Sequence, residues 1–177
     1  GAQLATLDID GPIISMAGAQ NHLAYVYYNQ NGSRQYVLLN IRDGTILSEG
    51  VLPLTTNSDL SWIGFDENKF LYSADSAGVV RMLSMDHWQK WMRICPLYKH
   101  GENVFVAYIA RHTVFYIRSE TANVSVLPLP TLHRAPFELK LLPNQTNGNN
   151  AKGFKYEQEF IFQNMLINSL KRNIIEN

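Results

Sequence analysis

The sequence predicts a mainly β protein, in which a succession of short strands is followed by one α-helix. Between residues 4 and 142, apolar and β-branched runs of about five to eight residues alternate with turn-forming clusters at roughly ten-residue spacing. From residue 156 onward the apolar residues recur at three- and four-residue steps, the period of an amphipathic helix. Such strand successions build sandwiches, barrels or propellers. At about 40 to 45 residues for each four-stranded blade, the chain holds about three blades of a β-propeller.

Composition and charge limit the classes of function. Of the 177 residues, 46% are hydrophobic and 17% are charged, which is typical of a globular protein with a buried core. Lys plus Arg and Asp plus Glu number 15 each, so we expect any association with DNA to be mainly indirect. We find no apolar run of transmembrane length and no signal peptide, so we expect an intracellular protein with no membrane partner.

The first predicted strand runs through LATLDIDGPIISMAG and is interrupted at Gly11-Pro12. Asp8 and Asp10 fall on one face of it. Because no third ligand lies nearby, we interpret them as a solvated face rather than as a metal site or an acid–base pair. The next strands flank Asn31-Gly32, a strong hairpin signal, and a further turn is predicted at Asp43-Gly44.

The central stretch, Trp62 to Leu83, is predicted to form one hairpin after the polar connector LPLTTNSDLS. Asp75-Ser76-Ala77-Gly78 supplies its turn, and Gly78 is expected to have a positive φ, which a side chain would penalise. Trp88 and Trp91 fall in the next predicted strand.

Three segments follow from these changes in pattern. Residues 1–142 form the propeller blades, with turns at Lys99–Asn103 and Arg111–Thr113 between the later strands. Residues 143–155 are rich in asparagine and are predicted to be a linker. Residues 156–177 are predicted to form one helix with acidic residues early and basic residues late, as the helix dipole favours.

Residues that perform catalysis or bind metals are not grouped in this sequence. The five histidines occur singly, at positions 22, 87, 100, 112 and 133. No nucleophile elbow and no glycine-rich phosphate loop is found. The single cysteine, Cys95, is interpreted as a buried, inert thiol. We therefore expect no enzyme activity, no catalytic residue, no metal and no cofactor.

Several side chains have a structural and a binding interpretation. Strand arginines at positions 81, 93 and 118 can bind phosphate or an acidic peptide, but salt-bridged or solvated positions are favoured. The tryptophans are interpreted as packing anchors, with an interface role as the alternative. On the terminal helix, Phe160, Met165 and Leu166 are predicted to form an oligomer or helical-bundle contact.

The block from Trp62 to Leu83 also resembles a known family. Trp62-Ile63-Gly64-Phe65, Tyr72, Asp75-Ser76-x-Gly78-x-Val80-Arg81-Met82-Leu83, Trp91 and Ile94-Cys95 are similar to the second half of the middle propeller in the replisome adaptor family. That family comprises the fungal chromosome-transmission-fidelity or minichromosome-loss proteins and the animal WD-repeat and HMG-box DNA-binding proteins. The residues we take as its structural blade signature are Trp62, Gly64, Asp75, Gly78, Arg81 and Trp91.

Weaker similarity extends the resemblance over nearly the whole chain. Gly11 to Gly18 matches the family's strand before the first hairpin, and Leu127 to Pro130 resembles the exit from the propeller. Glu157 to Phe160 resembles the start of the family's helical domain.

The resemblance implies part of a six-bladed propeller followed by a helical bundle, whose first helix would be residues 156–177. It further implies a nuclear, non-enzymatic scaffold for DNA replication and sister chromatid cohesion that self-associates as a trimer. In that family the scaffold links the replicative helicase, through its GINS complex, to DNA polymerase α by binding partner peptides on the bundle. Most of that bundle lies beyond this sequence, so no peptide-binding residue is assigned. The alternatives are a generic propeller interaction module unrelated to replication, and a propeller hydrolase or lectin.

Overall fold

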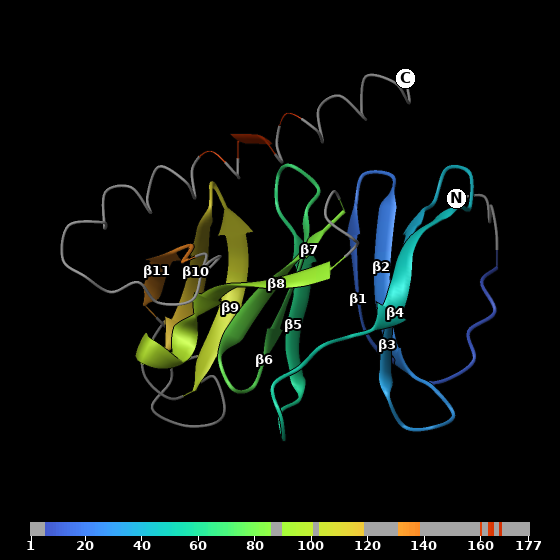
Figure 1. Cartoon of the computed structure of the whole chain (residues 1–177), viewed down its shortest axis with the longest axis horizontal. Helices are drawn as coiled ribbons and strands as arrows, with labels where there is room; N and C mark the ends of the chain where they lie inside the picture. Colours follow the sequence, from blue (N-terminus) through green and yellow to red (C-terminus); the bar gives the residue numbers. More distant parts are fainter. Residues whose placement is uncertain are drawn as a thin grey trace.

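Three antiparallel sheets make up the described part of the protein. The computed structural model describes residues 6–85, 90–100, 103–118 and 131–138, together with the single positions 160, 163, 164 and 167. Two of the sheets have four strands and one has three, and in each the strands neighbour one another in chain order. Figure 1 shows the sheets side by side along the length of the molecule.

The first sheet is a four-stranded meander. Its strands are β1 (Ile13–Ala19), β2 (His22–Tyr28), β3 (Arg34–Asn40) and β4 (Ile46–Val51). The predicted turns at Asn31-Gly32 and Asp43-Gly44 are confirmed, because Gly32 and Gly44 lie in the β2–β3 and β3–β4 loops with φ of 72° and 74°. A residue with a side chain rarely adopts this conformation, so the two glycines set where the strands reverse.

The second sheet contains the central stretch of the sequence. Its strands are β5 (Leu60–Phe65), β6 (Leu71–Asp75), β7 (Val79–Ser84) and β8 (Lys90–Pro96). The prediction of a single hairpin over Trp62 to Leu83 is therefore wrong, since this stretch makes three strands. The missed turn lies before Phe70, where Asp66 Oδ1 accepts hydrogen bonds from the backbone N–H groups of Asn68 and Phe70, both at 2.9 Å.

The third sheet follows a short 3₁₀-helix, η1 (Leu97–His100). Its strands are β9 (Val104–Ala110), β10 (Thr113–Arg118) and β11 (Leu132–Pro136). The predicted turn between β9 and β10 is confirmed, with positive φ at both Arg111 and His112.

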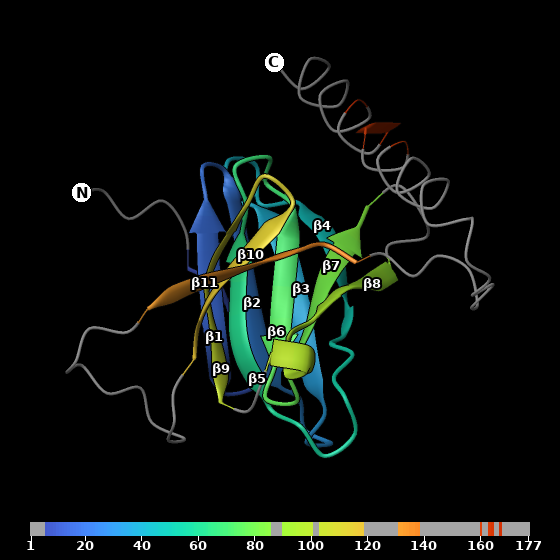
Figure 2. The same cartoon turned by 90° about the vertical axis from the view of Figure 1, so that its left-hand side faces the viewer.

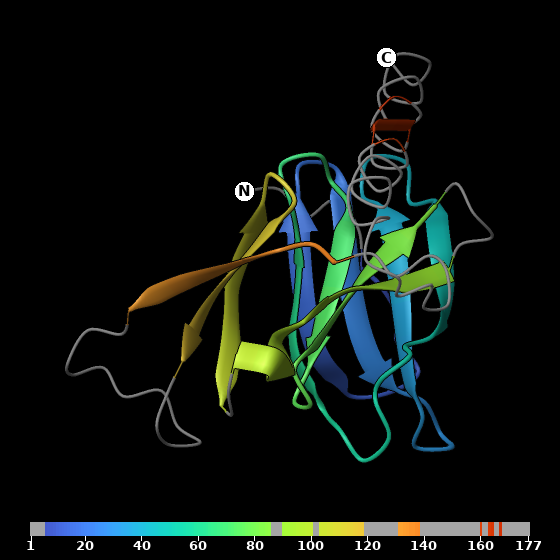
Figure 3. The same ribbon diagram turned by 60° about the vertical axis from the view of Figure 1, so that its left-hand side comes forward.

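The sheets fan out from their first strands. Strand β5 lies against β1 on one side and against β9 on the other, so the first strand of each sheet approaches the first strand of the next. Figures 2 and 3 show this stack from two further directions. Propeller blades have this arrangement, with the innermost strands around a common axis. The predicted fold class is confirmed as mainly β, with three antiparallel sheets compatible with part of a propeller.

The hydrophobic core lies between the sheets. Ala24 and Val26 of β2 pack with Leu71 and Leu83 of the second sheet, whereas the intervening Tyr25 belongs to a separate cluster with Val37 and Leu39. The neighbouring residues Tyr72 and Met82 point the other way and pack with residues of the third sheet. Successive side chains of a strand point to opposite faces of the sheet. Strands β6 and β7 are therefore buried on both faces, one face against the first sheet and the other against the third.

One predicted strand is absent. Residues 6–12 form no strand, although the sequence before Gly11-Pro12 alternates in polarity. Gly11 lies so close to β2 that a Cβ placed on it would come within 1.8 Å of the Tyr28 carbonyl oxygen, and Pro12 accepts a hydrogen bond from Tyr28 N at 3.1 Å. The segment thus passes the end of β2, and Asp8 and Asp10 are exposed there.

Several predictions fall outside the described residues. They concern Trp88, the stretch from Leu127 to Pro130, the linker at 143–155 and most of the terminal helix at 156–177. The helix, and the division of the chain into three segments, stay predictions.

Candidate functional site

The structure brings three of the six blade-signature residues into one place, at the turn between β6 and β7. Asp75 is the last residue of β6, Gly78 lies in the turn, and Arg81 is the third residue of β7. Asp75 and Arg81 are almost completely buried, at 1% and 3% exposure. Trp62 and Gly64 lie on the neighbouring strand β5, and Trp91 lies on β8.

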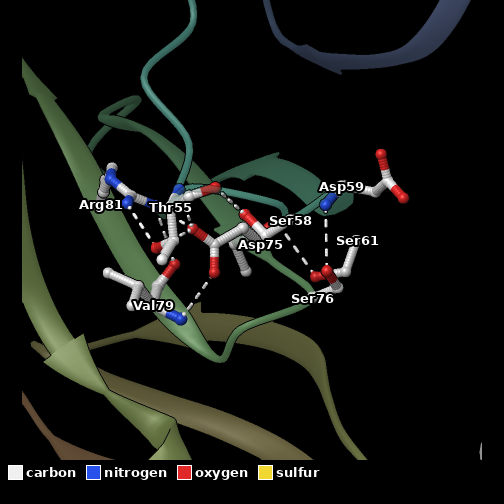
Figure 4. A network of polar contacts seen from close by, with 9 residues as sticks. Thr55, Ser58, Asp59, Ser61, Asp75, Ser76, Val79 and Arg81 are labelled. Carbon is white, nitrogen blue, oxygen red and sulfur yellow. Dashed lines mark hydrogen bonds and ion pairs between the residues drawn. The ribbon is translucent and has the colours of Figure 1, made fainter.

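A buried ion pair forms the centre of this site. Arg81 Nη1 donates to Asp75 Oδ2 at 2.5 Å, and Arg81 Nη2 donates to Thr55 Oγ1 at 3.0 Å. Thr55 itself donates to Asp75 Oδ2 through both its backbone N–H, at 2.9 Å, and its hydroxyl, at 2.8 Å. The other carboxylate oxygen, Asp75 Oδ1, accepts from Val79 N at 3.0 Å. Figure 4 shows this group, Thr55, Asp75, Val79 and Arg81, which we call the Asp75 cluster.

The electrostatics of the cluster favour an ionised Asp75. Burial alone would raise the pKa of this carboxyl, but the guanidinium of Arg81 and the hydrogen bonds from Thr55 and Val79 outweigh it and hold the pKa below its ordinary value. A buried charge that lost these partners would be strongly destabilising. The residues of the cluster therefore stabilise one another as a unit, and no acid or base poised for proton transfer results.

The cluster fixes the connector between the first and second sheets, residues 52–59. Ser58 donates to the Thr55 carbonyl from its hydroxyl at 2.6 Å, and Asp59 N donates to Ser76 Oγ at 3.0 Å. In return Ser76 N donates to the Asp59 carbonyl at 2.8 Å. Backbone and side-chain polar groups of this irregular segment are thereby paired within the connector and with the β6–β7 turn, as buried polar groups require.

Gly78 meets two requirements in the turn. Its φ of 74° confirms the predicted positive value. In addition, a Cβ at this position would lie 2.8 Å from the backbone nitrogen of Tyr98, which itself donates to the Gly78 carbonyl at 3.3 Å. The glycine thus allows η1 to pack directly against the turn.

Trp62 and Gly64 form a second pair within the signature. They lie two residues apart on β5 and therefore on the same face. A Cβ on Gly64 would lie 2.4 Å from Cζ2 of the Trp62 indole, so the ring covers the glycine. Trp62 packs against the core between the second and third sheets. The interpretation of this tryptophan as a packing anchor is therefore supported.

Trp91 packs at the other interface of the second sheet, where that sheet meets the first sheet. Its ring meets Tyr36 of β3 edge to face, with centroids 5.1 Å apart and an interplanar angle of 86°. Tyr36 in turn shares a hydrogen bond of 2.9 Å with the buried Ser48 hydroxyl. The signature residues thus contribute to both faces of the second sheet.

A second buried carboxyl connects the second and third sheets. Asp66 Oδ2 accepts from the Tyr72 hydroxyl at 3.0 Å, and Tyr72 lies against Phe137 with ring centroids 5.9 Å apart. Burial raises the pKa of Asp66, and the hydrogen bonds from Phe70, Tyr72 and Asn68 offset only part of this effect. The adjacent Glu67 accepts from Arg111 N at 2.8 Å and joins the β5–β6 and β9–β10 turns.

An open hollow lies beside the connector. It has a volume of about 710 Å³ and is lined by residues 33–34, 51–55 and 57–59. At its rim Arg34 forms an ion pair with the exposed Asp59 and lies over the Tyr28 ring, 5.5 Å from its centroid. Exposed ion pairs of this kind contribute little stability. A binding partner that separated Arg34 from Asp59 would therefore sacrifice little stability of the protein.

The remaining site predictions have mixed outcomes. Arg93 and Arg118 are exposed, in agreement with solvated positions, whereas Arg81 is salt-bridged and buried. Phe160 is 68% exposed, and Met165 and Leu166 lie outside the described residues, so the contact predicted for these three stays a prediction. Cys95 is buried, as expected. Two of the five histidines, His87 and His100, have no described side chain.

Among the described residues no group of three or more His, Cys, Asp or Glu side chains is placed to hold a metal ion. Within the same ranges no helix is both long and apolar enough to cross a membrane.

Thr55 and Asp66 were not predicted as site residues, although both stand in turn-forming stretches. Thr55 was missed because its partner Asp75 lies 20 residues away. Asp66 was missed because the turn that it forms was not recognised.

Comparison with known proteins gives matches along most of the chain. The model of the family "Minichromosome loss protein, Mcl1, middle region" matches residues 1–141. The protein ENHANCER OF LHP1 1 of Arabidopsis thaliana is 26% identical over 98% of this chain and 19% of its own length. WD repeat and HMG-box DNA-binding protein 1 is 35% identical in Homo sapiens and 30% identical in Xenopus laevis, each over 56% of this chain and 10% of the relative. The chain thus spans a fifth or less of each of these relatives.

Proposed function

Since the chain belongs to the family of the minichromosome loss protein Mcl1, middle region, we propose that it is part of a non-enzymatic scaffold of the DNA replication machinery. The family match over residues 1–141 is the observation that carries this proposal. The relatives named WD repeat and HMG-box DNA-binding protein 1 support a role on DNA, and hence in the nucleus.

The scaffold role agrees with the chemistry of the molecule. Its buried polar residues, Asp75, Arg81 and Thr55, satisfy one another and hold a connector in place. Such an arrangement provides a rigid platform for other proteins, because an interaction surface that is already ordered loses little conformational entropy on binding.

At the level of partners, we propose that the whole protein links the replicative helicase, through GINS, to DNA polymerase α. The three sheets would be part of a six-bladed propeller, and the predicted helix at 156–177 would open the helical bundle that binds partner peptides. Phe160, Met165 and Leu166 would contribute to that bundle or to the contact between subunits of a homotrimer.

The experiment is affinity capture with the full-length protein and purified partners. Immobilised full-length protein should retain both GINS and the polymerase α complex, and light scattering should give the mass of a trimer. Failure to retain either partner, with the protein folded, would refute the linking role.

A second candidate function is a propeller interaction module unrelated to replication. It is favoured by the relative that covers 98% of this chain, whose name refers to LHP1 and not to replication. Under this alternative the full-length protein would retain neither GINS nor polymerase α.

A further inference from the structure

We propose that Asn31 is a site of spontaneous deamidation, at which the side-chain amide is converted to a carboxyl group as aspartate or isoaspartate. The proposal rests on the tip of the β2–β3 hairpin, where Asn31 and Gly32 are both exposed. It is independent of the proposed function.

The residue after Asn31 determines the chemistry. Deamidation begins when the backbone nitrogen of the following residue attacks the asparagine side-chain carbonyl, and a side chain on that residue obstructs the approach. Gly32 has none, and apart from its two chain neighbours no residue has an atom within 4 Å of the position where a Cβ would be. Every other asparagine among the described residues precedes a residue with a side chain; these are positions 21, 29, 40, 57, 68, 103 and 164.

The bonds made and broken balance without an oxidant or a reductant. The Gly32 nitrogen loses its proton and forms a bond to Asn31 Cγ, while the bond from Cγ to Nδ2 breaks and ammonia leaves with that proton. Water then opens the five-membered imide. Attack at Cγ gives aspartate, and attack at the backbone carbonyl of residue 31 gives isoaspartate.

The turn slows this reaction but does not hide the reacting atoms. Gly32 N donates to the Asn29 carbonyl at 2.9 Å, and this hydrogen bond must open before the nitrogen can attack. The Asn29 side chain holds the same loop by accepting from Asn31 N at 3.0 Å and from Ser33 N at 2.9 Å. A local opening of an exposed loop requires far less free energy than global unfolding. We therefore expect Asn31 to react more slowly in the folded protein than in a flexible peptide, yet before the protein unfolds.

The products would change this end of the molecule. Both add a negative charge three residues from Arg34, whose guanidinium pairs with Asp59 beside the hollow. Isoaspartate also inserts an extra methylene into the backbone of a loop closed by the pairing of Tyr28 with Arg34. The hairpin register is set by this loop, so the isoaspartate form should be the less stable of the two products.

The test is incubation of the native protein at mildly alkaline pH, followed by trypsin digestion and mass spectrometry. The first lysine or arginine of the sequence is Arg34, so one tryptic peptide carries Asn31 together with Asn21 and Asn29 as internal controls. Within this peptide we expect a mass increase confined to residue 31 and isoaspartate detected by enzymatic methylation of the purified peptide, with neither signal in the same peptide of Asn31→Gln, which keeps the amide. The sequence contains a second Asn-Gly pair, Asn147-Gly148, which falls on a different tryptic peptide.

The isolated tryptic peptide, incubated in parallel, gives the rate without the fold. Modification of Asn31 in the free peptide but not in the folded protein would overturn the proposal, since it would show that the turn protects the site. Equal modification of Asn21 or Asn29 would overturn it as well. Circular dichroism melting of Asn31→Gln must match that of the wild type for the comparison to hold.

Discussion

The carboxylate of Asp75 and the guanidinium of Arg81 meet at 2.5 Å, across a turn that leaves both side chains almost fully buried. The pair is held by Thr55 from a connector 20 residues earlier in the sequence. It therefore joins the β6–β7 turn to the segment that enters the second sheet, and its removal should affect the stability of the whole sheet.

Replacement of Arg81 by Met should lower the free energy of unfolding by about 3 to 5 kcal/mol, because a buried carboxylate is left without its partner. The matched control is Arg93→Met, since Arg93 faces Arg81 in the neighbouring strand but is exposed, and it should change stability by less than about 1 kcal/mol. Urea unfolding followed by circular dichroism measures both. Equal effects of the two substitutions would show that the buried pair does not stabilise the sheet.

Gly78→Ala should be more destabilising than Gly44→Ala, although both residues have a φ of 74°. In both variants an alanine at positive φ destabilises the folded protein by about 1 kcal/mol. Only at Gly78 does the new Cβ also lie 2.8 Å from Tyr98 N, whereas nothing lies within 4 Å at Gly44. Thermal melting should therefore give a clearly lower midpoint for Gly78→Ala, and identical midpoints would contradict the close packing of η1 on the turn.

Gly64→Ala should destabilise the protein by about 1 to 3 kcal/mol, because the methyl group collides with the Trp62 indole. Gly18→Ala is the control, as its nearest neighbour is an oxygen atom 3.8 Å from the new Cβ. Tryptophan fluorescence should also shift in Gly64→Ala as the ring is displaced. If Gly64→Ala melts like the wild type and leaves the fluorescence unchanged, the ring does not cover the glycine.

The two buried carboxyls should give opposite pH dependences. The pKa of Asp75 is lowered in the folded protein, so its stabilisation is present above the ordinary value of 3.8 and is lost as the pH falls through the folded pKa. The pKa of Asp66 is raised, so stability falls as the pH rises from 3.8 through the folded pKa. Asn can keep the two backbone hydrogen bonds to Oδ1 at position 66.

We therefore expect that Asp66→Asn no longer loses stability as the pH rises above 3.8. We expect that Asp75→Asn lacks the stabilisation that the ionised Asp75 gives the wild type at the same pH. Unfolding free energies of the wild type and both variants, measured across the acid range, test this. The same slope change in both variants would contradict the assignment of opposite shifts.

The class of fold could be predicted from the sequence because it depends on strands and turns, which are indicated by residues close together in the chain. Asn31-Gly32, Asp43-Gly44 and Asp75–Gly78 place three of the turns correctly, since each depends only on residues that are adjacent in the chain. The strand predicted before Gly11-Pro12 was wrong because alternation in polarity does not reveal that Gly11 packs on the Tyr28 carbonyl. Similarly, the turn at Asp66 was missed because the whole stretch from Trp62 to Leu83 was interpreted as one hairpin with its turn at Asp75–Gly78, although the Asp66 side chain forms a turn of its own.

The candidate site was predictable only in part. Asp75, Gly78 and Arg81 stood out because they flank one turn, but the sequence contains no signal that Thr55 would complete the cluster from 20 and 26 residues away. Trp62 and Gly64 were named separately, and their contact follows from the two-residue period of a strand. Long-range partners are set by how sheets stack, which local pattern does not encode.

A bridging experiment tests the proposed linking role most directly. Purified GINS is immobilised and purified DNA polymerase α is added, with or without the full-length protein that contains this chain. We expect the polymerase to be retained only when the full-length protein is present. Retention that does not depend on the protein, or no retention in its presence, would contradict the linking role.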